Sequence, residues 1–295
     1  NTDTMINDYV GKIRRKVSIY SKNKTSNLFD GSYKSVYQGN GMDFENLREY
    51  IPGDNIRDID WKATARGNKV LVKRYVAEKK HNIMLVFDTG KKMTADTLGA
   101  EEKKEIALNA GGTLGYLGAI NGNNVGAIYN RNGHIQYFQL RTGLLNVERI
   151  LTEYHKEKCS DYDASLEKSL QYLTRYIRRR MIVFIITDES GLHSISDDTI
   201  KLLSYQHDVL FVNISDADIT GKNAYSVDRG IYVPEFISGN KKLKKLEQEI
   251  KEELREENKK RLRRYGIIST QISTEDEVMD RITELLGGHK YANNR

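Results

Sequence analysis

Two aspartates, Asp88 and Asp188, occur where a binding site is expected in an α/β protein. Each one directly follows an apolar, strand-sized run, residues 83–87 and residues 181–187. In an open parallel sheet the carboxyl ends of the strands share one edge, and ligands bind beyond that edge. Two carboxylates there could hold a divalent cation or carry out acid–base chemistry. We therefore take this edge of the predicted sheet as the candidate site.

A lysine close to these carboxylates weakens the case for acid–base chemistry. Lys92 lies four residues after Asp88, and an ammonium group among carboxylates favours ion pairing over proton transfer. We predict that Lys92 pairs with Asp88 or Asp188.

No other group of residues predicts an enzyme. Cys159 and His155 have the four-residue spacing that brings two side chains together on a helix, as a nucleophile and its base require. A surface histidine and an incidental buried cysteine are far commoner. The sequence has no Ser-His-Asp order, zinc-ligand spacing or phosphate-binding loop. We predict a non-catalytic protein without a cofactor.

The elements that position this edge follow a strand-then-helix rhythm. Near-continuous apolar strands alternating with helices predict an α/β fold, with a doubly wound, mainly parallel sheet and helices on both faces. Strands are expected at residues 83–88, 124–129, 134–140, 181–187, 207–214 and 267–272. Helices are expected at residues 4–20, 100–120, 147–155, 164–178, 196–205, 241–264 and 277–286. Residues 58–76 are expected to form two further strands joined by a turn at 66–68.

Glycines within the second of these helices indicate close packing. Gly111, Gly112, Gly115 and Gly118 lie well inside residues 100–120, whereas a phosphate-binding role needs glycines in a strand-to-helix turn. Each glycine costs about 1 kcal/mol against alanine in a helix. We therefore predict that this helix lies unusually close to the sheet.

Three segments are expected along the chain. Residues 1–80 form an amino-terminal helix and a strand-and-loop elaboration packed on the core. Residues 81–238 form the α/β domain, and residues 239–295 form a charged helix followed by a terminal strand and helix.

Composition excludes some classes of protein. The 295 residues are 38% hydrophobic and 30% charged, with one cysteine, so neither a disulfide framework nor a cysteine-rich zinc site is expected. No apolar run reaches the length of a membrane span, no secretory signal is visible, and we expect a cytoplasmic protein.

The net charge of +6 is spread along the chain. Nucleic-acid binding through the basic run at 175–180 and the basic ends of residues 241–264 is a less favoured alternative.

Residues 41–66 form a dense block of charged side chains around a Pro-Gly-Asp turn and the single tryptophan. The favoured interpretation is structural: an ion-pair network, with the tryptophan as an anchor, that holds the amino-terminal segment on the sheet. The alternative is that the same residues face a partner. The block comprises Arg48, Glu49, Tyr50, Pro52, Gly53, Asp54, Arg57, Asp60, Trp61, Lys62 and Arg66.

This block resembles the signature of bacterial domain-of-unknown-function family 58, whose members are related to von Willebrand factor type A domains. The resemblance rests on the runs 47–54 (LREYIPGD) and 59–66 (IDWKATAR), and on Thr187-Asp188. It implies a von Willebrand A-like protein-interaction domain, a protein of the short type without a membrane segment, and a MoxR-type AAA+ ATPase as partner.

The resemblance also implies a metal-ion-dependent adhesion site at the sheet edge, and this sequence departs from it. The usual Asp-x-Ser-x-Ser motif reads Asp88-Thr89-Gly90-Lys91-Lys92, and the second loop has Tyr162-Asp163 where a Thr-Asp pair is common. We predict a degenerate, metal-free site in which Lys92 replaces the ion. The alternative is an unusual magnesium site formed by Asp88, Asp163 and Asp188.

The function expected from this sequence is that of a non-catalytic adaptor in protein assembly or maturation. Its partner-binding edge would comprise Asp88, Gly90, Lys92, Tyr162, Asp163 and Asp188. A divalent-metal-dependent protein-binding domain remains the alternative.

Overall fold

The computed structural model describes residues 2–23, 42–67, 69–77, 80–97, 99–159, 165–217, 225–226, 231–232 and 240–292. The chain divides into two compact units. The first comprises residues 1–32 and 81–295, and the second comprises residues 33–80. The division at 80/81 and 238/239 made from the sequence stays a prediction.

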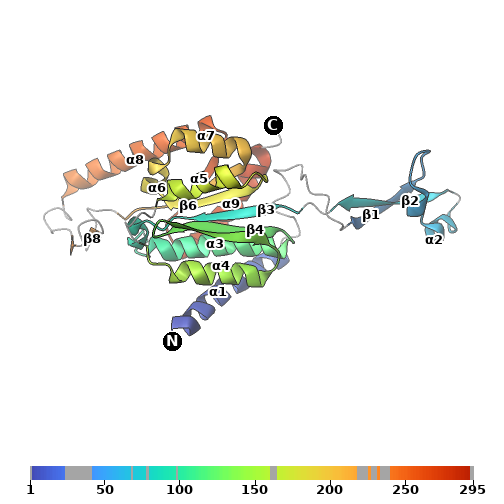
Figure 1. Ribbon diagram of the computed structural model, residues 1–295, viewed down its shortest axis with the longest axis horizontal. Coiled ribbons are helices and arrows are strands. Elements are labelled where there is room, and N and C mark those ends of the chain that lie inside the picture. The colour runs from blue at the N-terminus through green and yellow to red at the C-terminus, as the bar shows by residue number, and fades with distance from the viewer. Residues whose placement is uncertain are drawn as a thin grey trace. The chain divides into compact units, whose positions relative to one another are not determined.

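A six-stranded sheet forms the centre of the first unit, in the order β10-β7-β6-β3-β4-β5 (Figure 1). The first five strands in this order are parallel, and β5 runs antiparallel to β4. Every residue of β3 and β6 is buried, as expected for strands covered on both faces. The predicted α/β fold is confirmed. The strands are β3 (Asn82–Phe87), β4 (Asn124–Arg131), β5 (His134–Arg141), β6 (Ile182–Asp188), β7 (Asp208–Ile214) and β10 (Ile268–Ile272), with a short separate pair, β8 (Tyr225–Ser226) and β9 (Ile231–Tyr232).

Helices cover both faces of the sheet, because alternate strand residues point to opposite sides. Leu85 joins the core cluster of one face, whereas Met84 and Val86 join that of the other. The first face is covered by α1 (Thr2–Asn23), α3 (Lys103–Ile120), α4 (Leu144–Lys156) and α9 (Val278–Ala292). The second is covered by α5 (Leu166–Tyr176), α6 (Glu189–Ser194), α7 (Asp197–Gln206) and α8 (Lys241–Arg264).

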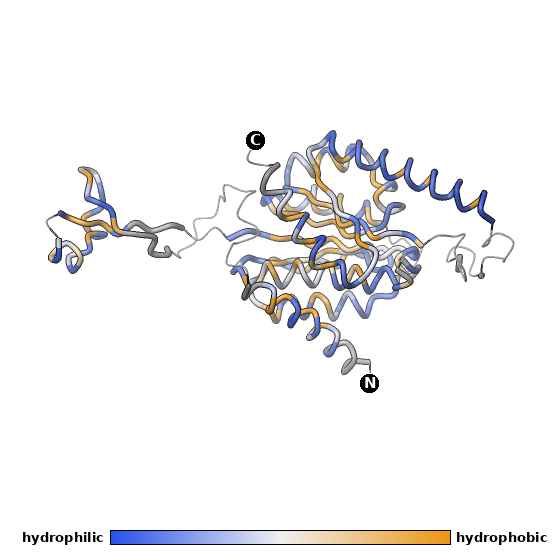
Figure 2. Tube along the Cα trace, turned by 180° about the vertical axis from the view of Figure 1, so that it is seen from behind, coloured by the Kyte–Doolittle hydropathy of each residue, from blue (hydrophilic) through white to orange (hydrophobic). Residues whose placement is uncertain are grey.

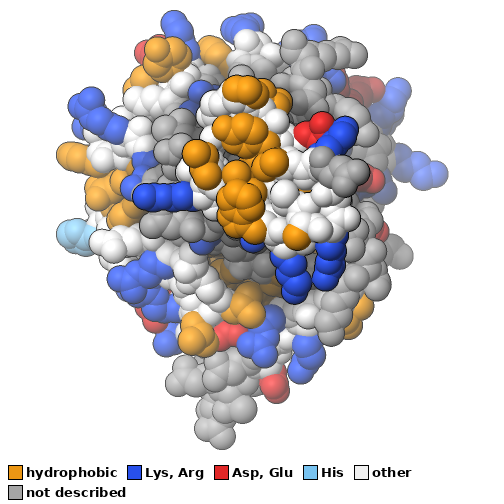
Figure 3. Space-filling view, turned by 90° about the vertical axis from the view of Figure 1, so that its right-hand side faces the viewer, with side chains coloured by type: hydrophobic (Ala, Val, Ile, Leu, Met, Phe, Trp, Pro, Cys, Tyr) orange, Lys and Arg blue, Asp and Glu red, His pale blue; other side chains and the backbone are white. Residues whose placement is uncertain are grey.

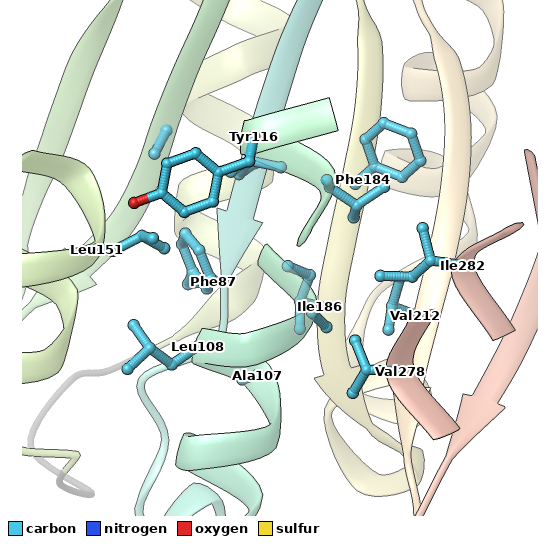
Figure 4. Close-up of a cluster of buried hydrophobic side chains, with 14 of the residues drawn as sticks. Phe87, Ala107, Leu108, Tyr116, Leu151, Phe184, Ile186, Val212, Val278 and Ile282 are labelled. Atoms are coloured by element: carbon cyan, nitrogen blue, oxygen red, sulfur yellow. The ribbon is translucent and has the colours of Figure 1, made fainter. Parts of the chain in front are cut away.

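Helix α3 lies against the sheet as closely as its glycines predict. A Cβ atom on Gly111 would overlap the ring of Phe87, and one on Gly118 would lie 2.6 Å from Cδ1 of Ile83. Figure 4 shows this part of the core, which includes Phe87 and Ile186 of the sheet and Leu108 of α3. The glycines therefore serve close packing between helix and sheet.

The carboxy-terminal elements match their predictions. Helix α8 is hydrophilic along most of its length (Figure 2). It ends before Gly266, whose φ of +66° is the left-handed conformation typical of a helix terminus. Of the helices in the described ranges, none is both long and apolar enough to cross a membrane.

The second unit contains the antiparallel pair β1 (Met42–Glu49) and β2 (Leu71–Ala77). Between the two strands lie a 3-10 helix, η1 (Ile56–Asp58), and a one-turn helix, α2 (Trp61–Thr64). Strand β2 confirms the second of the two strands predicted in residues 58–76. The prediction of the first of these strands is wrong. The side chain of Asp60 accepts hydrogen bonds from the backbone N–H groups of Lys62 and Ala63 and so starts a helical turn. The predicted turn at 66–68 ends at Asn68, outside the described residues.

Candidate functional site

The carboxyl ends of β3, β6 and β7 bring three aspartates to one edge of the sheet. Asp88 follows β3, Asp188 ends β6, and Asp216 lies two residues beyond β7. The three strands are adjacent and parallel, so their carboxyl ends lie side by side. The structure thus brings together the two carboxylates that the sequence singles out and adds a third.

Lys103, the first residue of α3, provides the positive charge of this cluster. Its Nζ donates a hydrogen bond to Oδ2 of Asp188 at 2.8 Å and another to Oδ1 of Asp216. The side chains of Lys103 and Asp188 are 1% and 2% exposed. A buried charge is tolerated only when it is paired. Lys103 therefore pairs with both carboxylates and offsets part of their negative charge.

The prediction that Lys92 pairs with Asp88 or Asp188 is wrong. Nζ of Lys92 donates instead to the hydroxyl of Ser190 at 2.8 Å, and the lysine is exposed. The cause is the 3-10 helix η2 (Lys91–Thr94), which buries Met93 and leaves Lys92 on the solvent side. The ammonium group that pairs with Asp188 comes from a different element of the fold.

Protein donors occupy every carboxylate oxygen of Asp88 and Asp188. Asp88 accepts from the backbone N–H of Gly90 at 2.8 Å and from the hydroxyl of Thr187 at 2.5 Å. Asp188 accepts from the backbone N–H of Gly191 at 2.7 Å and from Lys103. These four oxygens are therefore already engaged by hydrogen-bond donors.

Backbone packing also closes the space beside these carboxylates. A Cβ atom on Gly191 would overlap the hydroxyl of Thr187 and lie 2.5 Å from Oδ2 of Asp88. Only glycine at this position lets α6 pack directly on the Asp88 carboxylate.

Asp88 differs from Asp188 because no ion pair reaches it in the described structure. Its carboxyl is buried, and this burial raises the pKa of Asp88 to about 6, despite the opposing hydrogen bond from Thr187. Asp88 therefore takes up a proton more readily than an exposed carboxylate does.

Two side chains of helix α8 donate hydrogen bonds to residues next to the aspartates of this edge. Nε of Arg255 donates to Oε1 of Glu189 at 2.7 Å, and Glu189 is buried directly after Asp188. Burial raises the pKa of Glu189, and the bond from Arg255 opposes that rise. Nζ of Lys251 donates to the carbonyl of Ala217 at 2.8 Å, next to Asp216. The charged helix thus fixes the residues that flank Asp188 and Asp216.

The pairing considered for Cys159 and His155 gains no support. Burial raises the pKa of the Cys159 thiol to about 12, whereas a catalytic cysteine needs a lowered pKa. Nδ1 of His155 lies 3.5 Å from a carboxylate oxygen of Glu105. A thiol in this setting is the opposite of an activated nucleophile.

Two residues assigned to the edge from the sequence, Tyr162 and Asp163, lie outside the described residues. Within the ranges that the structure describes, no group of three or more His, Cys, Asp or Glu side chains is arranged to hold a metal ion. Sequence reasoning also missed Lys103 and Asp216. Asp216 carried a usable signal, since it follows an apolar strand as Asp88 and Asp188 do, whereas nothing in the local sequence marks Lys103.

The charged block of the second unit contains part of the predicted ion-pair network. Arg48 donates two hydrogen bonds to Asp54, at 2.6 and 2.8 Å, and the same carboxylate accepts from the backbone N–H of Ile51. These bonds fix the turn at Gly53, whose φ is +108°. The side chain of Trp61 is 65% exposed, and its role as an anchor on the sheet stays a prediction.

Comparison with known proteins places this chain in a family. The model of "Protein of unknown function DUF58" matches residues 46–220. Among curated proteins, "Uncharacterized protein Rv1480" of Mycobacterium tuberculosis and "Uncharacterized protein Mb1516" of Mycobacterium bovis are each 24% identical over 204 residues, which is 68% of this chain. The match spans 64% of the length of these relatives.

Solved structures with a related arrangement share little sequence with this chain. BatB from Bacteroides thetaiotaomicron is 10% identical, with a TM-score of 0.41 over 72% of this chain and 99% of that one. A von Willebrand factor type A protein from Catenulispora acidiphila is 9% identical, with a TM-score of 0.39 over 75% of this chain and 45% of that one. The family is shown by the sequence match over residues 46–220, which covers more than half of the chain: this protein belongs to the DUF58 family.

Proposed function

We propose that this DUF58 protein is a non-catalytic protein-interaction module that binds its partner at the carboxyl edge of the sheet without a metal ion. The observation that carries the proposal is the buried ammonium group of Lys103 between Asp188 and Asp216. An adhesion site of the metal-dependent kind relies on a divalent cation to offer positive charge to a partner. Here a fixed lysine supplies the charge that holds the edge together.

The donor set argues against magnesium at this edge. All four oxygens of Asp88 and Asp188 accept hydrogen bonds from protein groups. A hard divalent cation would have to share these oxygens with the protein donors and approach the ammonium of Lys103, which repels it. The alternative, a magnesium site completed by Asp163, requires these contacts to rearrange.

The proposal that the protein is not an enzyme rests on the side chains of Cys159 and Asp188. The thiol of Cys159 has a pKa of about 12, so it is not an activated nucleophile. Asp188 is held in an ion pair by Lys103, which leaves it poorly suited to proton transfer. The ion pair of Asp188 with Lys103 therefore supports structure rather than chemistry.

The partner we propose is a MoxR-type AAA+ ATPase in the cytoplasm, acting in protein assembly or maturation. The family resemblance motivates this choice. On the described part of the edge, the exposed ammonium of Lys92 beside Ser190 offers a cationic contact. Gly90, Tyr162 and Asp163 belong to the same proposed binding face.

The experiment is a binding assay between the full chain and a purified MoxR-type ATPase, without nucleotide and in the presence of a chelator. We expect measurable binding, weakened about tenfold by Lys92→Glu if one charged contact is reversed. Lys201→Glu is the matched control, because Lys201 is an exposed lysine of α7, away from this edge. Binding that requires added magnesium would favour the metal-dependent alternative. An equal loss of affinity in both variants would show that the sheet edge is not the binding surface.

A further inference from the structure

The second unit exposes a set of apolar side chains between β1 and β2. Ile51, Ile56, Trp61 and Val70, here called the tip patch, are 59%, 64%, 65% and 40% exposed. Backbone bonds hold the flanking segments together, since Tyr50 N donates to the carbonyl of Val70 at 2.9 Å. Figure 3 shows hydrophobic side chains gathered near the centre of this view. Exposed apolar clusters rimmed by polar residues are typical of interaction sites.

Side-chain hydrogen bonds keep the backbone of the tip patch in one conformation. Asp54 holds the turn after Ile51. The side chain of Asn55 accepts from the backbone N–H of Arg57 at 3.1 Å, and that of Asp60 accepts from the N–H of Ala63 at 2.9 Å. A surface fixed in this way loses little conformational entropy when a partner binds.

Some of the charged side chains around the tip patch form ion pairs, and others do not. Arg48, Lys69 and Lys73 pair with carboxylates of the same unit, namely Asp54, Glu49 and Asp60. Arg57, Lys62 and Arg66 are exposed, and the described structure gives none of the three an ion pair. Among the carboxylates of residues 50–70, Asp58 alone is without an ion pair in the described structure. The net unpaired charge beside the patch is therefore positive.

We propose that the tip patch docks an acidic protein segment that carries bulky apolar side chains. Trp61 would bury its exposed ring against those side chains, and Arg57 and Arg66 would pair with the carboxylates. Tryptophan and arginine dominate the binding energy of many interfaces, and the guanidinium group matches carboxylate geometry with two parallel hydrogen bonds. The tip patch belongs to the second unit, whereas the sheet edge belongs to the first.

A protein partner fits the patch better than an anionic membrane does. Residues 42–77 carry seven Lys or Arg and six Asp or Glu side chains. Attraction to an anionic bilayer grows with the number of basic side chains near the surface, and the six carboxylates of this unit oppose it. A bilayer also gains nothing from apolar side chains held in a fixed order, whereas a protein segment does.

The test is photo-crosslinking from Ile56→p-benzoylphenylalanine in the full chain, in the cells that make it. The crosslinked peptides, sequenced by mass spectrometry, are expected to be rich in Asp and Glu with neighbouring apolar residues. Adding Arg57→Glu and Arg66→Glu is expected to lower the yield about tenfold, as loss of two exposed charge pairs implies. Neither arginine makes a described ion pair, so circular dichroism of this variant should match the parent.

Two controls make the result decisive. Tyr205→p-benzoylphenylalanine places the same probe on another exposed apolar position, 84% exposed on α7. Lys201→Glu with Lys244→Glu makes the same change of charge on exposed residues of α7 and α8. The proposal is overturned by labelling no stronger than at Tyr205, by crosslinks to a second copy of this chain, or by segments without acidic residues. Crosslinks to lipid, or co-sedimentation with vesicles of 70% phosphatidylcholine and 30% phosphatidylserine that depends on Trp61, would likewise replace it with membrane binding.

Discussion

Replacement of Lys103 by methionine tests the charge cluster at the sheet edge most sharply. The variant keeps the length and apolar stem of the side chain but removes the ammonium that pairs with Asp188 and Asp216. Breaking a buried ion pair by removing one partner typically costs 3–5 kcal/mol, since the remaining charge is buried without compensation. The side chain of Asp216 is 31% exposed and can be hydrated, whereas that of Asp188 is 2% exposed. We therefore expect the lower end, a loss of about 3 kcal/mol in the free energy of unfolding.

The assay is urea unfolding at pH 7, followed by circular dichroism. Lys92→Met is the matched control on the same edge, because Lys92 is exposed and bonds only to Ser190 in the described structure. Its unfolding free energy should change by less than about 0.5 kcal/mol. The double variant Lys103→Met with Asp188→Asn should be at least about 1 kcal/mol more stable than Lys103→Met alone, because no unpaired charge stays buried. A loss below about 1 kcal/mol in Lys103→Met, or a larger loss in Lys92→Met, would refute this reasoning.

Three further predictions concern buried groups. Burial raises the pKa of Asp88 from 3.8 to about 6, so its contribution to stability is present below pH 3.8 and is lost as the pH rises through 6. As the pH rises from 4 to 6, the free energy of unfolding of Asp88→Asn should increase by up to about 3 kcal/mol relative to that of the wild type, as measured by urea unfolding. Burial lowers the pKa of His207 from 6.5 to about 4, so its contribution is present above pH 6.5 and is lost as the pH falls through 4. As the pH falls from 6.5 to 4, the free energy of unfolding of His207→Gln should therefore increase by up to about 3 kcal/mol relative to that of the wild type. A difference from wild type that does not change with pH, in either variant, would contradict the stated pKa shift. Gly111→Ala should lower stability by about 1–3 kcal/mol because the new Cβ overlaps Phe87, whereas Gly11→Ala, with nothing within 4 Å, should be neutral or up to about 1 kcal/mol stabilising in thermal unfolding.

The sequence predicts the sheet and its helices well because their signals are local. Continuous apolar runs predict β3 and β6, and glycines inside residues 100–120 predict the close approach of α3 to the sheet, which the structure shows at Phe87. These patterns depend on neighbours within one element, so they can be read without knowledge of the fold.

The failures occur where contacts between distant residues decide the outcome. Lys103 and Asp188 are 85 positions apart, and the pairing depends on where α3 begins relative to the end of β6. Lys92 is closer in sequence to Asp88, but the helical turn that buries Met93 directs it to solvent. Residues 58–64 alternate like a strand, yet the capping side chain of Asp60 makes a helical turn that leaves Trp61 exposed.

The central claim, that a lysine replaces the metal ion at the sheet edge, is tested most directly by calorimetric titration of magnesium and manganese. The titration uses chelator-treated wild-type protein, with Asp88→Ala as the control. We predict no specific heat of binding in either protein, because the buried ammonium of Lys103 repels a cation and protein donors already bond the carboxylate oxygens of Asp88 and Asp188. Stoichiometric micromolar binding to the wild type that is lost in Asp88→Ala would contradict the account and establish a metal-dependent site.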